Sequence, residues 1–243
     1  MDRRIDNWHS PRIGIDMPIV AYGWAGPPLL MLPTASADFL EYERFGMINT
    51  LAPFIDAGRM RVYSVNSVNK YSIFDYGQSP NIRTALLTAY DEYIIQEVLP
   101  WIRNYSSDPW AMPVITGISM GGYTSANTFL KHSDVFRGLI AISGSYDIRS
   151  YFGSYYDDNL YFNNPVDYLP NLNDDYHLSR LRDRSIILFT GQGAFEDPSR
   201  TYQLSDLLNA KGISHWLDVW GHDVNHDWPW WHKAMPIYVN RLF

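Results

Sequence analysis

A serine at the centre of a glycine-rich turn is the first candidate for chemistry. The segment Gly117-Ile118-Ser119-Met120-Gly121 matches the pattern Gly-x-Ser-x-Gly. Met112–Thr116 before it predicts a strand, and Thr124–Lys131 after it continues as a helix. On a sharp strand-to-helix turn the serine hydroxyl is exposed, and its neighbours two residues away must be small. The pattern therefore predicts Ser119 as a nucleophile, with the Met120 backbone N–H as a donor to a developing oxyanion.

A serine hydroxyl is a weak nucleophile and needs an adjacent base, for which histidine is the usual choice. In hydrolases with this kind of turn, the histidine follows the last strand, which we expect to end near Trp220. His226 lies just before a predicted final helix, and Pro229 suits the first turn of that helix. We favour His226 as the base, with His222 as the alternative. His215 lies within or beside a strand and is more consistent with a structural role.

The carboxylate that orients the imidazole should lie on the loop after the predicted strand Ser185–Thr190. That loop carries two adjacent candidates, Glu196 and Asp197. The spacing from Gly193 favours Glu196, and Asp197 stays open as the alternative. The carboxylate that is not the acid is expected to cap the following helix.

A second oxyanion donor is expected from the loop after the apolar strand Leu29–Leu32. This loop, Pro33–Phe39, contains the small residues Ala35 and Ser36. Small side chains allow a carbonyl oxygen to approach the backbone closely. The sequence therefore predicts a donor N–H at Ala35 or Ser36.

Composition excludes several other classes of protein. The chain has 243 residues, no cysteine and a formal net charge of −7. Without cysteine there are no disulfides, thiolate nucleophiles or cysteine-based zinc sites. The acidic balance without a basic run argues against nucleic acid or an anionic membrane as partner, and no apolar stretch is long enough to span a bilayer. The start of the chain, Met1–Asp6, lacks an apolar segment after its arginines, so we expect a cytoplasmic protein.

Strands that alternate with helices predict how these residues are brought together. Two of the expected helices are Ala85–Arg103 and Tyr202–Lys211, and such crossovers imply a mostly parallel sheet covered on both faces. The length fits a single α/β domain over residues 1–243. The expected strands are residues 18–22, 29–32, 61–65, 114–117, 138–142, 185–190 and 215–220.

Aromatic residues gather in two segments that are expected to flank the site. The chain holds 9 Trp, 18 Tyr and 11 Phe. Five of the tryptophans lie in the last 28 residues, around His226, and could fix that histidine. A tyrosine-rich insertion at residues 147–184, before the acid-bearing strand, has no clear strand. We expect either a lid or pocket-lining segment there, or a packed excursion whose tyrosines are simply buried.

Taken together, the chain resembles the putative esterase family of the α/β-hydrolase superfamily. Relatives in that family include S-formylglutathione hydrolases, feruloyl esterases, enterochelin-type esterases and mycolyltransferases. The resemblance is carried by the loop at Leu29–Phe39, the turn at Gly117–Gly122 and the ending His226-Asp227-Trp228. It implies an α/β-hydrolase fold and hydrolysis of a small-molecule carboxylic ester without a metal or organic cofactor. One departure is the absence of the cysteine-containing segments of S-formylglutathione hydrolases.

Three alternatives remain at this stage. The spacing His222-x-x-x-His226 would suit two zinc ligands on one helix face, but Asp223 replaces the expected glutamate, and Gly221 and Pro229 leave little room for a helix. An acyltransferase would use the same three residues and differ only in the acceptor. A non-catalytic, aromatic-lined binding module would be favoured only if Ser119, the acid or His226 were missing.

Overall fold

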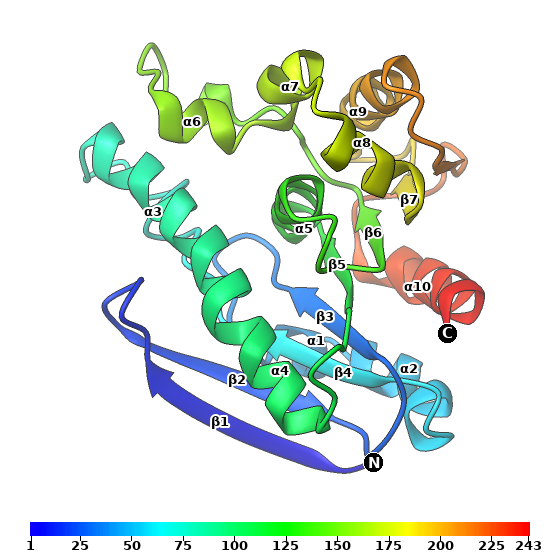
Figure 1. Ribbon diagram of the computed structural model, residues 1–243. Coiled ribbons are helices and arrows are strands. Elements are labelled where there is room, and N and C mark those ends of the chain that lie inside the picture. Colours follow the sequence, from blue (N-terminus) through cyan, green and yellow to red (C-terminus); the bar gives the residue numbers. More distant parts are fainter.

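The computed structural model describes all 243 residues and contains one eight-stranded sheet (Figure 1). The strands lie in the order β1-β2-β4-β3-β5-β6-β7-β8. The pairs β1–β2 and β2–β4 are antiparallel, and every other pair is parallel. Their bounds are β1 (Arg3–His9), β2 (Asp16–Tyr22), β3 (Pro28–Leu32), β4 (Arg61–Val65), β5 (Val114–Ile118), β6 (Gly138–Ile142), β7 (Ser185–Thr190) and β8 (Trp216–Val219).

The central strands are the continuous apolar runs of the sequence. Every residue of β3, β5 and β6 is buried, as expected for parallel strands covered on both faces. The seven predicted strands are all present. Among the strands, the sequence prediction missed only β1, whose polar side chains are mostly exposed at the edge of the sheet. An edge strand of this kind carries a weak hydrophobic pattern.

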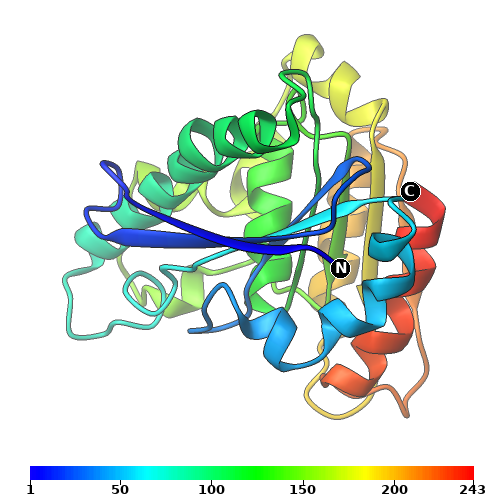
Figure 2. The ribbon, with the colours of Figure 1, turned by 90° about the horizontal axis from the view of Figure 1, so that it is seen from below.

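Helices cover both faces of the sheet (Figures 1 and 2). One apolar core lies between the sheet and α3, α4, α5 and α9, and the other lies between the sheet and α2 and α10. The α-helices are α1 (Glu41–Arg44), α2 (Met47–Asp56), α3 (Pro80–Tyr93), α4 (Leu99–Ser106), α5 (Met120–Lys131), α6 (Asp158–Phe162), α7 (Pro165–Tyr168), α8 (Asp175–Arg182), α9 (Pro198–Ala210) and α10 (Trp228–Leu242). The remaining helical turns are the π-helical η1 (Ile94–Val98) and the 3-10 turns η2 (Arg149–Tyr151) and η3 (Leu169–Asn171).

Helix starts differ from the sequence prediction where proline or glycine occupies the first turn. The helix predicted from Ala85 begins at Pro80, and the one predicted from Tyr202 begins at Pro198. Proline is favoured at the first helical position because it has no N–H to leave unpaired. Helix α5 begins at Met120, directly after the candidate nucleophile, and its first turn contains two glycines.

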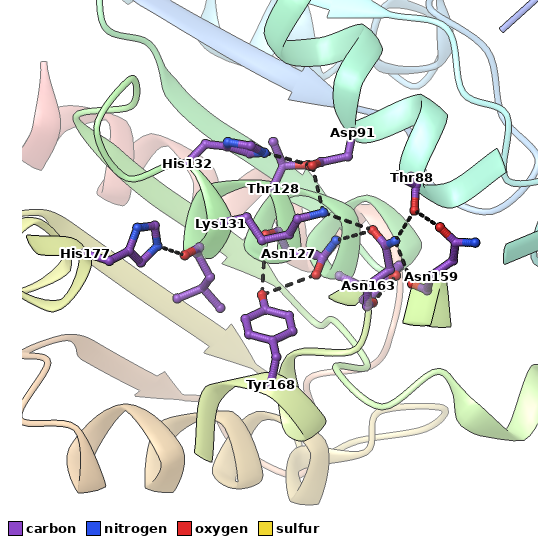
Figure 3. A network of polar contacts seen from close by, with 12 residues as sticks. Thr88, Asp91, Asn127, Thr128, Lys131, His132, Asn159, Asn163, Tyr168 and His177 are labelled. Atoms are coloured by element: carbon purple, nitrogen blue, oxygen red, sulfur yellow. Dashed lines mark hydrogen bonds and ion pairs between the residues drawn. The ribbon is translucent and has the colours of Figure 1, made fainter. Parts of the chain in front are cut away.

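The tyrosine-rich insertion contains no strand, as predicted, but it is largely helical, with α6, α7 and α8 joined by short turns. Figure 3 shows how it is attached to the rest of the molecule. The Asn163 amide donates to Thr88 of α3 and accepts from Asn127 of α5, and the Tyr168 hydroxyl also bonds Asn127. These contacts join the insertion to the two helices beneath it.

Four aromatic residues of the insertion line one of two cavities. Only Tyr151 borders the cavity that holds Ser119. Tyr161, Phe162 and Tyr168 line a separate cavity of about 430 Å³ at the other end of α5. Only the first turn of the insertion therefore borders the candidate site, and Tyr156, Phe162 and Tyr176 are exposed. None of the helices combines the length and apolar character required to span a lipid bilayer.

Candidate active site

Ser119 occupies the strained turn between β5 and α5. Its backbone has φ 57° and ψ −118°, a conformation that non-glycine residues rarely adopt. The turn is tight: a Cβ on Gly117 would lie 2.2 Å from the Gly121 backbone, and one on Gly121 would lie 2.2 Å from the Leu32 carbonyl oxygen. The Ser119 N–H donates to the Ile142 carbonyl of the neighbouring strand at 2.8 Å. Met120 is the first residue of α5, so its N–H has no partner within the helix.

The hydrogen bonds of the loop after β3 distinguish the two predicted oxyanion donors, Ala35 and Ser36. The Ser36 N–H is already bonded to Asn69 Oδ1 at 2.6 Å. The Thr34 N–H donates to Glu41 Oε2 at 2.8 Å, and the Ala37 N–H faces the Thr34 carbonyl at 3.5 Å. Ala35 is the residue whose N–H these contacts leave available. The geometry therefore favours Ala35 over Ser36.

Two buried side chains hold this loop in place, and the sequence did not single out either of them. Asn69 bonds the loop twice, through Oδ1 to the Ser36 N–H and through Nδ2 to the Thr34 carbonyl at 2.9 Å. Glu41 accepts from both the N–H and the hydroxyl of Thr34. Burial raises the pKa of Glu41, while the two Thr34 contacts lower it. No local sequence pattern marks these two residues, because their partners are distant or lie in an irregular loop.

The loops that carry the candidate acid and base are joined directly to each other. The Gly193 N–H donates to the Val224 carbonyl at 2.8 Å, and the His226 N–H donates to the Ala194 carbonyl at 2.9 Å. The Ala194 N–H donates to Asn225 Oδ1 at 2.8 Å. A Cβ on Gly193 would lie 2.4 Å from that oxygen, so glycine permits this close approach.

Glu196 is the carboxylate that reaches the imidazole. Its Oε2 lies 3.5 Å from His226 Nδ1, and its side chain is 1% exposed. Its Oε1 accepts from the Ser143 hydroxyl at 2.6 Å, and the Thr190 hydroxyl lies 3.3 Å from Oε2. The His226 side chain is 23% exposed and packs edge-on against the Trp231 ring at 5.0 Å between centroids.

Asp197 has the capping role expected of the second carboxylate. Its side chain accepts from the Ser199 N–H at the start of α9 and forms an ion pair with Arg200 at 3.1 Å. The Ser199 hydroxyl and Arg200 lower the pKa of Asp197. The side chain is 56% exposed, in contrast to the buried Glu196.

Five of the predicted residues line one cavity of about 130 Å³. These are Ser119, Met120, Glu196, Asp197 and His226. Ala35 and Ser36 do not border this cavity, but their loop follows Leu32 and Pro33, whose carbonyl oxygens lie against the start of α5. The remaining lining residues are Tyr123, Ser143, Gly144, Ser145, Tyr151, Phe195 and Arg200.

No other histidine lines this cavity. His222 is exposed in a turn, so it shares no helix face with His226. His215 bonds the Ser205 hydroxyl at 2.6 Å, which supports the structural role predicted for it. His177 bonds the Leu130 carbonyl (Figure 3). No group of three or more His, Cys, Asp or Glu side chains is arranged to hold a metal ion.

His132 belongs to a buried charge network centred on Asp91 of α3 (Figure 3). Asp91 accepts from His132 Nε2, Lys131 Nζ and the Thr128 hydroxyl, each at 2.8 Å. Burial acts to raise the pKa of Asp91, but its bonds to His132 and Lys131 outweigh burial, and the pKa is lowered. This network joins α3 to the end of α5, far along the helix from Ser119.

Comparison with known proteins places this chain in a family. A family model described as "Putative esterase" matches residues 66–242. The chain belongs to the putative esterase family. The match spans the serine turn, the Glu196 loop and His226, and it confirms the resemblance inferred from the sequence. The chain is therefore an esterase of the carboxylesterase type. No curated protein sequence matches it.

Solved structures of low sequence identity share the whole fold of this esterase. A ferulic acid esterase aligns with a TM-score of 0.75 at 19% identity, over 100% of this chain and 99% of its own. An S-formylglutathione hydrolase from Staphylococcus aureus aligns with a TM-score of 0.70 at 18% identity, over 99% and 95%. A fluorophosphonate-binding serine hydrolase of the same organism aligns with a TM-score of 0.69 at 19% identity, over 99% and 97%. These alignments confirm the α/β-hydrolase fold.

Proposed function

We propose that this esterase cleaves its substrate through an acyl-enzyme on Ser119, with His226 as base and Glu196 as acid. One observation carries the proposal. Ser119 and His226 line the same cavity, and the imidazole Nδ1 faces the buried Glu196 carboxylate at 3.5 Å. A buried carboxylate on one side of the ring holds the proton on Nδ1 and leaves Nε2 free to accept one.

The proposed reaction has two halves. His226 takes the Ser119 proton as the hydroxyl oxygen attacks the ester carbonyl, and the imidazolium then protonates the departing alkoxide. Water enters, loses a proton to His226 and attacks the acyl-enzyme, which releases the carboxylic acid and restores the serine. Throughout, the Glu196 charge stabilises the imidazolium.

The negative charge on the carbonyl oxygen would be held by two backbone N–H groups. Met120 supplies one from the start of α5, where the helix dipole adds favourable potential. Ala35 supplies the second from a loop that Asn69 and Glu41 hold in place. Donors fixed before the reaction are worth more than donors that must reorganise.

The cavity favours a small acyl group. Its volume of about 130 Å³ is below the roughly 300–1,000 Å³ typical of pockets for drug-sized ligands. Tyr151, Phe195 and Arg200 also border it, and the Phe195 side chain is 93% exposed. A larger alcohol group would therefore extend past these residues toward solvent. The aligned S-formylglutathione hydrolase is named for a thioester with a small formyl group and a larger leaving group, which agrees with this arrangement, whereas the aligned ferulic acid esterase is named for an ester of a larger aromatic acid.

The proposal is tested by replacing Ser119 and His226 separately with alanine and measuring hydrolysis of p-nitrophenyl acetate. Each variant should remain folded, and its rate of ester hydrolysis should fall to the rate measured without enzyme. A matched control is Ser64→Ala, because Ser64 is a fully buried serine of β4 whose hydroxyl has no hydrogen-bond partner. Retained turnover in Ser119→Ala would overturn the assignment. Full activity in His226→Ala would move the base to His222.

A further inference from the structure

We infer that Ser143 and Trp231 form a positioning relay behind the acid of the proposed catalytic triad. Neither residue need touch substrate for this role. The Trp231 indole N–H bonds the Ser143 oxygen, the Ser143 hydroxyl bonds Glu196, and Glu196 faces His226. The inference rests on the proposed roles of Ser119, Glu196 and His226, and it assigns a function to two residues outside the triad.

The direction of each hydrogen bond follows from the chemistry of the groups. The indole Nε1–H can only donate, and it lies 3.4 Å from Ser143 Oγ. An ionised carboxylate can only accept, so the Ser143 hydroxyl donates its single proton to Glu196 Oε1 at 2.6 Å. The indole N–H and the Ser143 hydroxyl therefore form a chain of two hydrogen bonds that ends on the acid.

Ser143 is the main donor to the buried carboxylate apart from the imidazole. The Glu196 side chain is 1% exposed, so water cannot stabilise its charge. The Thr190 hydroxyl oxygen lies 3.3 Å from Oε2 but only 3.0 Å from the Gly191 carbonyl oxygen, and it has one proton to donate. Without the Ser143 hydroxyl, no other short hydrogen bond would fix the rotation of the carboxylate toward His226.

The backbone at Ser143 adopts a strained conformation. Ser143 has φ 51°, one of only five positive φ values among non-glycine residues, and Ser119 is another. The two serines directly follow the paired residues Ile118 and Ile142 of β5 and β6. The Ser143 N–H donates to the Phe189 carbonyl of β7 at 2.8 Å. A non-glycine residue in this conformation is strained, and such strain gathers at functional sites.

Trp231 connects the relay to the base as well as to the acid. Its ring meets the His226 ring edge-on at 89°, so the same side chain limits how the imidazole can tilt. Trp231 is itself 4% exposed and packs edge-on against Trp228. It lies in the first turn of α10, which Asp227 caps through the Trp228 N–H. Of the aromatic residues near the C-terminus, Trp231 is the one placed to fix His226.

Two substitutions at Ser143 separate positioning from backbone strain. Ser143→Ala removes the hydroxyl and keeps the strained φ, whereas Ser143→Gly removes the hydroxyl and relieves the strain. With p-nitrophenyl acetate, both should lower kcat by about tenfold to a hundredfold, since a hydrogen bond to a buried charge is lost, and leave KM within about twofold. Thermal denaturation should rank the glycine variant as the more stable of the two. Ser64→Ala should match the wild type in kcat.

Proton NMR distinguishes a positioning role from a merely structural one, because a change in stability alone would not alter the resonance of the His226 Nδ1 proton. The Nδ1–H of His226, held against Glu196, should give a strongly downfield resonance that is absent from His226→Ala. Both Ser143 variants should shift or broaden it, and Ser64→Ala should keep it. Trp231→Phe, which keeps a ring against His226 but loses the N–H, should lower kcat by about threefold to tenfold. Its matched control is Trp101→Phe, which loses an indole bond to Asp6 Oδ2 far from the site.

The inference is overturned if Ser143→Ala and Ser143→Gly both keep the wild-type kcat and the downfield resonance. It is also overturned if Ser143→Gly has the wild-type kcat while Ser143→Ala does not, because a variant without the hydroxyl would then be fully active. Failure of the triad itself would appear differently, as undiminished turnover in Ser119→Ala. Should the Ser143 variants fail to fold, Trp231→Phe decides alone: an unchanged kcat and resonance would refute the relay.

Discussion

Glu196→Gln is the substitution that measures how strongly the buried carboxylate supports the base. The change keeps the shape of the side chain and removes its charge. The carboxylate lies 3.5 Å from His226 Nδ1. With an effective dielectric of about 20, a unit charge pair at this distance attracts by about 4.7 kcal/mol. This energy corresponds to about 3,000-fold in rate if all of it is expressed in the transition state.

The expected loss is somewhat smaller, because the His226 side chain is 23% exposed and water screens part of the attraction. We therefore expect kcat for p-nitrophenyl acetate to fall by about 300-fold to 3,000-fold, with KM little changed. The matched control is Asp197→Asn. Asparagine caps a helix as well as aspartate does, so kcat should stay within about threefold of the wild type. A greater loss in Asp197→Asn than in Glu196→Gln would refute the assignment of the acid.

Three further predictions follow from the same geometry. Asn69→Ala removes the two bonds that Asn69 makes to the loop carrying Ala35, and it should lower kcat by about tenfold to a hundredfold. A wild-type kcat would show that Asn69 has no role in shaping the oxyanion site. Asp91→Asn breaks a buried ion network and should lower the free energy of unfolding by about 2–4 kcal/mol in urea titrations, with kcat unchanged. Because the pKa of Asp91 is lowered in the fold, its stabilisation is present above about pH 4 and is lost as the pH falls further, so wild type and variant should converge in acid; a constant difference across pH would contradict this. Across p-nitrophenyl esters, kcat/KM should be at least about tenfold higher for acetate or butyrate than for octanoate, since the cavity is only about 130 Å³, and the reverse order would show that the acyl group lies elsewhere.

The sequence was sufficient to predict the parts of the fold that local patterns determine. Buried parallel strands such as Val114–Ile118 are continuous apolar runs, and the glycines around Ser119 mark a turn where no side chain fits. The strand Arg3–His9 was missed because an exposed edge strand lacks such a run. The tyrosine-rich insertion was predicted to lack strands, but its short helices depend on contacts with α3 and α5, which sequence periodicity does not show.

The candidate site was predictable to the level of residue type and chain order. Glu196 and Asp197 are adjacent, so only burial and direction distinguish them: one side chain faces His226 and the other caps α9. Ser143 carries no motif, and its positive φ becomes visible only in the structure. Asn69 contacts a loop more than thirty residues before it in the chain. Such long-range contacts are set by tertiary packing and leave no local sequence signal.

The central claim is that Ser119 carries the acyl group during turnover. The most direct measurement is to treat the folded protein with a fluorophosphonate, which traps a nucleophilic serine, and to locate the adduct by peptide mass spectrometry. The account predicts one adduct per chain, on Ser119, with loss of p-nitrophenyl acetate hydrolysis in proportion to labelling and no adduct in Ser119→Ala. An adduct on another residue, or full hydrolytic activity in a chain labelled at Ser119, would contradict it.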